Sequence, residues 1–127
     1  NQLGNLVSRA AAMSVSYFNG QLDDIKIDWT QKEVDLEAAI KDYDFKSYLD
    51  QVFEVVADAN EAIDKKAPFK LVKEDEAAAK QVLSELAEQI RFVGRALQPI
   101  IPQTADEILR RYGKIILKGD ALFPRRD

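Results

Sequence analysis

Apolar residues recur at intervals of three and four along almost the whole chain, while the alternation of β-branched and polar residues that marks a strand is nowhere convincing. This spacing places apolar side chains on one face of an α-helix, and such a face must be buried against other helices. A length of 127 residues with 46% hydrophobic content suffices for one core. We therefore predict an all-α protein, a single domain over residues 1–127, folded as an antiparallel helical bundle of about five helices.

Helix-ending residues divide the chain. Asn19-Gly20 suits the positive φ angles that end a first helix, and a shorter helix is expected from about Thr30 to Tyr43. Asp44 is expected to cap a long third helix, which Pro68 ends because proline cannot continue it.

The second half of the chain has similar signals. Asp75 is expected to cap a fourth helix, and Pro102 suits the first turn of a last helix, which Gly113 ends. From Lys114 to Asp127 we predict an extended C-terminal tail, in which Leu122-Phe123-Pro124 folds back onto the bundle.

The corner between the third and fourth helices combines an aromatic ring with positive charge. Phe69 directly follows Pro68, and four lysines flank it: Lys65, Lys66, Lys70 and Lys73. An aromatic platform surrounded by lysines can stack an unpaired base and hold its phosphates. The alternative is that Phe69 is a hydrophobic plug at the end of the bundle, and the residue types alone favour this alternative.

Two further features have a structural and a functional interpretation. Asn5 and Arg9 lie at i and i+4 on the flank of the first helix, where an amide and a guanidinium could read the edges of unstacked bases. From spacing alone, an ordinary solvated helix face is favoured.

Trp29 could stack a ligand, but we expect it to fix a loop to the core. The acidic loop with Asp23, Asp24 and Asp28 lacks the calcium-loop pattern, so we expect no metal site.

The composition excludes several chemistries. The chain has no cysteine, which rules out disulfides and thiolate metal sites, and no histidine, the commonest general base. We therefore expect no catalytic residues and no cofactor in this chain.

No apolar stretch of about 18 residues could span a membrane, and no signal-peptide pattern is present, so we expect no membrane partner and a cytoplasmic location. The first methionine is Met13, so we expect a chain that is either processed or cut from a longer protein, and we favour the second.

Charge is distributed unevenly. The formal net charge is −4, but residues 1–60 carry five basic and eleven acidic side chains, whereas residues 61–127 carry thirteen basic and eleven acidic ones. A partner with phosphates would therefore meet the second half of the chain, or a local patch, rather than the whole surface. The local excess is weak compared with dedicated nucleic-acid-binding domains, and we expect no DNA partner.

Four stretches, in order along nearly the whole chain, resemble the anticodon-binding helical bundle of bacterial-type methionyl-tRNA synthetases, which are class I aminoacyl-tRNA synthetases. Leu3-Gly4-Asn5-Leu6-Val7-Ser8-Arg9 resembles the Gly-Asn-Leu-x-x-Arg stretch that begins this bundle. Asn60-x-x-Ile63-Asp64, followed by Ala67-Pro68-Phe69-Lys70-Leu71-Val72-Lys73, is similar to the family's Asn-x-Tyr-Ile-Asp and Ala-Pro-Trp-Lys-Leu-Ala-Lys. The other two stretches are Leu97-Gln98-Pro99-Ile100-Ile101-Pro102-Gln103-Thr104-Ala105 and the tail Leu122-Phe123-Pro124-Arg125.

The resemblance implies a role in tRNA recognition. It implies that Asn5, Arg9 and Phe69, beside Pro68, contact the CAU anticodon loop. From their place around Phe69, we expect Lys65, Lys66, Lys70 and Lys73 to steer the RNA backbone. Phe69 stands where the family usually has tryptophan, which keeps a stacking face but removes the indole N–H donor; Ala62 stands where tyrosine is usual.

The catalytic signatures of the family are absent from this sequence, and so is any cysteine for a zinc-binding insertion. The resemblance implies that ATP and methionine bind a catalytic domain of the same parent chain. The sequence leaves two alternatives open. The chain could be the anticodon-binding domain of another class I synthetase, for valine, leucine, isoleucine or cysteine, or a helical protein-interaction bundle that does not bind RNA.

Overall fold

The computed structural model describes residues 1–119 and confirms the all-α fold. Six helices are present in this part of the chain, one more than expected, because the corner after Pro68 forms a short helix of its own. They are α1 (Gln2–Phe18), α2 (Thr30–Lys41), α3 (Phe45–Lys66), α4 (Pro68–Glu74), α5 (Glu76–Leu97) and α6 (Pro102–Arg111). None of the helices described is long and apolar enough to cross a membrane.

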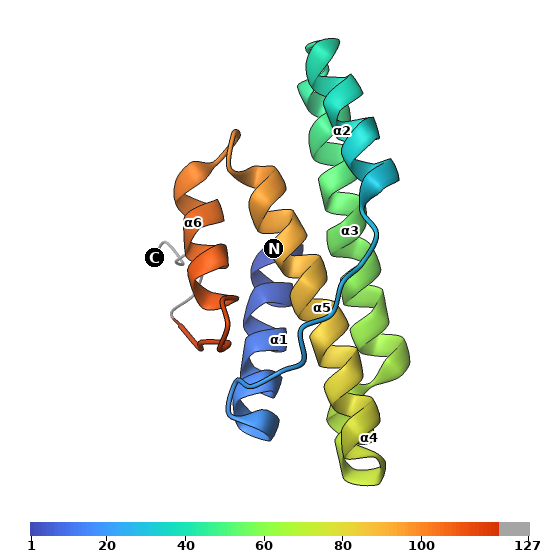
Figure 1. The fold of residues 1–127 in the computed structure, drawn as a ribbon, viewed down its shortest axis with the longest axis vertical. Helices are drawn as coiled ribbons and strands as arrows, with labels where there is room; N and C mark the ends of the chain where they lie inside the picture. Colours follow the sequence, from blue (N-terminus) through green and yellow to red (C-terminus); the bar gives the residue numbers. More distant parts are fainter. Residues whose placement is uncertain (120–127) are drawn as a thin grey trace.

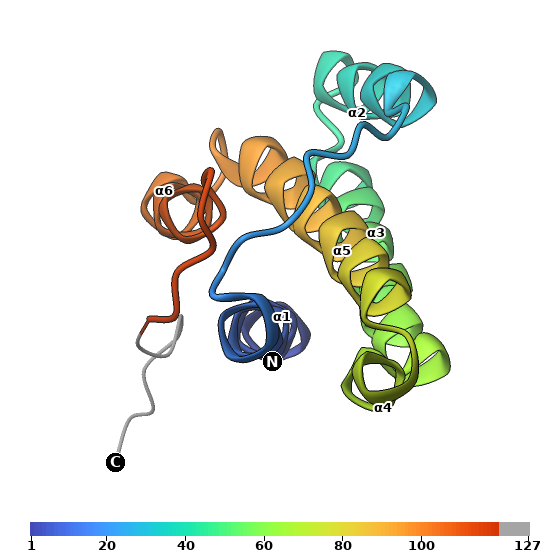
Figure 2. The same cartoon turned by 60° about the horizontal axis from the view of Figure 1, so that its bottom comes forward.

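The central helix is α5, which runs antiparallel to α1, α3 and α6 (Figures 1 and 2). In contrast, α1 and α3 run side by side in the same direction. Asn60 Nδ2 donates to Gln2 O at 3.1 Å, and further along both helices Arg9 contacts Asp64. The parallel arrangement is possible because residues 19–29, which we call the strap, cross α5 before α2 begins.

The helix ends follow the signals in the sequence. Asp44 Oδ1 accepts a hydrogen bond from Ser47 N at 3.0 Å, and Asp75 Oδ1 accepts one from Ala78 N at 3.0 Å. Both aspartates satisfy a backbone N–H that the first turn of a helix leaves unpaired. Asn19 and Gly20 have positive φ angles of 57° and 77°, which confirms the prediction that this pair ends the first helix.

The core is continuous from α1 to the turn that follows α6. Tyr112 is buried, and its hydroxyl donates to Val7 O at 2.6 Å, which joins the end of α6 to α1. Burial raises the pKa of this tyrosine. Ile116 is also buried, and its backbone N–H donates to Gly20 O at 2.8 Å. The predicted fold-back of Leu122-Phe123-Pro124 lies outside the described residues.

The carboxylate of Glu107 on α6 should make stability depend on acidic pH. It accepts hydrogen bonds from Arg110, at 2.8 Å from both Nε and Nη2, and from Arg111 Nε at 2.9 Å. These bonds lower the pKa of Glu107 from 4.5 to about 2. Because the pKa is lower in the folded state than in the unfolded state, the stabilisation is present above pH 4.5 and is lost as the pH falls towards 2.

We expect Glu107→Gln to reduce the loss of stability over this pH range. Thermal melts of both proteins at neutral pH and at steps through the acidic range would measure the difference. Asp58→Asn is a suitable control, because Asp58 is exposed and has no polar partner within residues 1–119. Equal acid sensitivity of the wild type and Glu107→Gln would contradict the assignment.

Candidate nucleic-acid interface

The corner between α3 and α4 is set by the pair Ala67-Pro68. Ala67 adopts a left-handed conformation with φ 44° and ψ 61°, and its N–H donates to Ile63 O at 3.0 Å, closing α3. Pro68 is the first residue of α4, where its missing N–H costs no helical hydrogen bond. The side chain of Pro68 is buried. Pro68 therefore shapes the corner from inside the fold, and the side chains that a ligand can reach are those of the residues after it.

The exposed face of α4 carries the aromatic ring and two cations. At 100° per residue, Phe69, Lys70 and Lys73 fall within an arc of about 100°, while Leu71 and Val72 point with Pro68 towards the bundle. The side chain of Phe69 is 38% exposed, so its ring can be reached by a ligand. Within residues 1–119, neither lysine has an ion-pair partner. This face therefore combines a free aromatic surface with uncompensated positive charge.

The α1 residues predicted to contact RNA lie beside the last turns of α3. Asn5 and Arg9 are both exposed, and Arg9 Nη2 lies 3.4 Å from Asp64 Oδ1. Asp64 precedes Phe69 by five residues. The ion pair thus brings the polar face of α1 to the end of α3 from which the corner starts. The sequence gives no signal for the contact between Asp64 and Arg9, because this contact depends on the parallel packing of α1 and α3.

The four lysines near Phe69 do not form one group. Lys65 Nζ is 2.6 Å from Glu61 Oε1 on the same helix, and Lys66 Nζ is 3.4 Å from Glu85 Oε2 on α5. Lys66 follows Asp64 by two positions, which is a rotation of about 200° around α3, so Lys66 points away from α1. Lys70 and Lys73 are the lysines that share the exposed face of Phe69.

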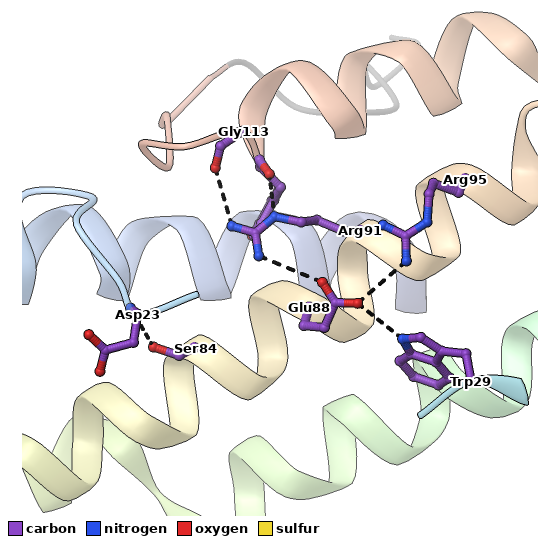
Figure 3. Close-up of polar contacts among 8 residues, drawn as sticks. Asp23, Trp29, Ser84, Glu88, Arg91, Arg95 and Gly113 are labelled. Atoms are coloured by element: carbon purple, nitrogen blue, oxygen red, sulfur yellow. Dashed lines mark hydrogen bonds and ion pairs between the residues drawn. The ribbon is translucent and has the colours of Figure 1, made fainter. Parts of the chain in front are cut away.

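Trp29 fixes the strap to α5, as the structural interpretation of this residue predicted. Its ring stacks on Phe92 with centroids 4.1 Å apart and an interplanar angle of 17°. Its Nε1 donates to Glu88 Oε2 at 3.1 Å, as Figure 3 shows. The same carboxylate accepts from Arg95 Nη2 at 3.4 Å and lies 3.9 Å from Arg91 Nη1. Their positions in sequence, an acidic residue followed by arginines three and seven residues later, could have indicated this cluster.

Arg91 extends the contacts of this cluster to the end of α6. Its Nε donates to Tyr112 O at 2.6 Å and its Nη2 to Gly113 O at 3.2 Å. On the strap, the backbone N–H of Asp23 donates to Ser84 Oγ at 3.0 Å. These contacts hold together three segments that are distant in sequence (Figure 3). Each of these side chains has a hydrogen-bond or ion-pair partner within residues 1–119. We therefore assign the cluster a structural role.

Two of the three acidic residues of the strap, Asp23 and Asp28, have side-chain partners within residues 1–119. The carboxylate of Asp23 lies 3.7 Å from Lys80 Nζ, and Asp28 Oδ1 accepts hydrogen bonds from the N–H and hydroxyl of Thr30 at 3.0 and 2.6 Å. The hydroxyl contact is the main reason that the pKa of Asp28 is lowered. Within residues 1–119, no group of three His, Cys, Asp or Glu side chains is placed to bind a metal ion.

Comparison with known proteins finds relatives among the methionine–tRNA ligases. Over the whole chain, the sequence is 32% identical to a methionine–tRNA ligase of Clostridium acetobutylicum, 30% identical to one of Streptococcus pyogenes serotype M1 and 28% identical to one of Listeria monocytogenes. In each case the chain spans 24% of the relative's length. No protein-family model matches the chain. The chain is therefore related over its whole length to a domain of methionyl-tRNA synthetase, the family that its sequence motifs predicted.

Proposed function

We propose that this chain is the anticodon-binding domain of a methionyl-tRNA synthetase and that it recognises the CAU anticodon loop. The relationship to methionine–tRNA ligases supports the choice of family and disfavours the synthetases for other amino acids. The observation that carries the RNA-binding proposal is the exposed face of α4. There Phe69 can stack a base while Lys70 and Lys73, free of acidic partners in the described part of the chain, contact the backbone.

Base recognition in this proposal comes from α1. Asn5 offers an amide donor and acceptor, and Arg9 offers a fork of donors, so that together they can read the edge of an unstacked base. The Arg9 guanidinium has five N–H donors, and its contact with Asp64 involves one of its terminal nitrogens. Asp64 can therefore orient Arg9 while other donors remain for RNA. The negative charge of Asp64 also disfavours any binding mode that places a phosphate beside it.

The remaining steps of aminoacylation are assigned to the rest of a longer chain. The sequence has no histidine, and residues 1–119 contain no group of side chains placed to bind a metal ion. We propose that ATP and methionine bind a separate catalytic domain of the same protein, in the cytoplasm. The partners of this domain are then tRNA and that catalytic domain.

The proposal is tested with RNA hairpins that share one stem and differ only in the anticodon. Fluorescence anisotropy at low salt should show at least tenfold tighter binding of the CAU loop than of GAU, GAC or GCA loops, which correspond to isoleucine, valine and cysteine tRNAs. Equal binding of all four loops would leave only backbone contacts and contradict anticodon recognition. Absence of binding by a demonstrably folded protein would favour a protein-interaction bundle.

The salt dependence of RNA binding should separate the two pairs of lysines. We expect Lys70→Ala with Lys73→Ala to weaken binding of all loops alike and to reduce the log–log salt slope by about 1 to 2 from an initial value on the order of −2 to −4. The matched control is Lys65→Ala with Lys66→Ala, whose amino groups already contact Glu61 and Glu85. A larger effect of the control pair would place the RNA backbone on the α5 side of α3.

A further inference from the structure

The first half of α3 has an apolar stripe that α1 does not cover. Phe45 is 53% exposed and Phe53 is 38% exposed, and Leu49 between them is partly buried. These residues follow one another at intervals of four, so they lie along one side of the helix. Single exposed apolar residues are common on protein surfaces. Exposed apolar residues that lie together on one side of a helix are less common and indicate an interaction site.

The stripe continues the surface on which α1 packs. Phe53 and Leu49 precede Asn60 by seven and eleven residues, so both point within about 20° of the direction of Asn60. Asn60 contacts Gln2, in the first turn of α1. Figure 1 shows that α3 extends well beyond the start of α1. With a rise of 1.5 Å per residue, Phe53 lies about 10 Å and Phe45 about 22 Å beyond the level at which α1 begins.

The other sides of this half of α3 have partners. Lys32 of α2 lies 3.8 Å from Glu54, and the hydroxyl of Tyr48 donates to Ala96 O of α5 at 2.7 Å. Measured around the helix axis from Asn60, Glu54 lies about 120° away on one side, and Tyr48 lies about 120° away on the other. The apolar stripe is therefore the sector between these two neighbours, the same sector that α1 fills in the second half of α3.

We propose that the stripe formed by Phe45, Leu49 and Phe53 is the docking face for an amphipathic segment from the rest of a longer synthetase chain, seated in line with α1. The stripe is continuous with the α1–α3 interface, which shows what kind of surface fits there: a helix with an apolar face. The relatives are about four times as long as this chain and so contain further segments to supply it. The proposal rests on the family relationship, and it can be tested in the absence of RNA.

Site-specific photocrosslinking in the full-length protein, without RNA, tests the proposal. A benzophenone amino acid at position 53 keeps an aromatic ring in place of Phe53, and the same group at position 45 serves as a second probe. The control is position 58, because Asp58 is exposed on the opposite side of α3 from Asn60. Circular dichroism confirms that each variant is folded.

We expect at least tenfold more intramolecular crosslink from position 53 or 45 than from position 58, joined to residues outside these 127. Crosslinks between two copies of the protein would overturn the proposal in favour of a dimer interface. Equal yields at all three positions, or crosslinks confined to these 127 residues, would show that the stripe has no such partner. A protein that consists of these residues alone would overturn it as well.

Discussion

Replacing Leu86 or Ile90 by alanine is expected to lower the free energy of unfolding by about 2–5 kcal/mol. Both side chains are fully buried on α5, the helix that contacts α1, α3, α4 and α6. Removing their outer carbons loses apolar burial and leaves a cavity that the surrounding helices can only partly close. Urea unfolding followed by circular dichroism measures the change through the midpoint at an unchanged slope.

A matched control for this experiment is Val34→Ala. Val34 is an apolar residue on α2 with more than half of its side chain exposed, so its truncation should cost no more than about 0.5 kcal/mol. If Leu86→Ala and Ile90→Ala were no more destabilising than Val34→Ala, α5 would not be the centre of the core.

Phe69→Ala is expected to weaken binding of the CAU hairpin by about one to two orders of magnitude. Stacking of a base on an aromatic ring contributes roughly 1–3 kcal/mol by alanine substitution, and a tenfold change in affinity corresponds to about 1.4 kcal/mol. Phe69→Trp should hold or improve the affinity, because indole offers a larger stacking surface and an N–H donor. Equilibrium titration of each variant with the same labelled hairpin measures both effects.

The control for this effect is Phe53→Ala. Phe53 and Phe69 are both phenylalanines with 38% of the side chain exposed, but Phe53 lies in the first half of α3, far from the corner. Truncation of Phe53 should leave RNA binding unchanged within about twofold. Equal losses for the two variants would show that general stability, rather than base stacking, determines the affinity. An unchanged affinity of Phe69→Ala would exclude this ring as the stacking platform.

Local sequence signals predicted most of the helix boundaries. Asp44 and Asp75 cap helices and Pro102 lies in a first turn because these effects act over three or four residues and need no distant partner. The short helix α4 was harder to predict, since seven residues contain too few turns for a clear apolar pattern. The sequence therefore predicts a corner at this point rather than a separate helix.

Long-range pairing could not be derived from the sequence. The direction of α1 relative to α3 depends on the path of the strap across α5, which Trp29 and Glu88 fix by contacts between residues almost 60 positions apart. For the same reason, the pairing of Arg9 with Asp64 was not foreseen. The division of the four lysines also depended on the fold, because Lys66 is paired with Glu85 of α5 rather than with a neighbour on its own helix.

The length of α3 has a mechanical consequence. This single helix of 22 residues is about 33 Å long, with the apolar stripe at its beginning and Asp64 in its last turn. A helix packed along its length behaves as a stiff rod, so a tilt of about 10° at one end moves the other end by roughly 6 Å. A change in how the stripe is held would therefore displace the corner that carries Phe69, and α3 would act as a lever between the two ends of the domain.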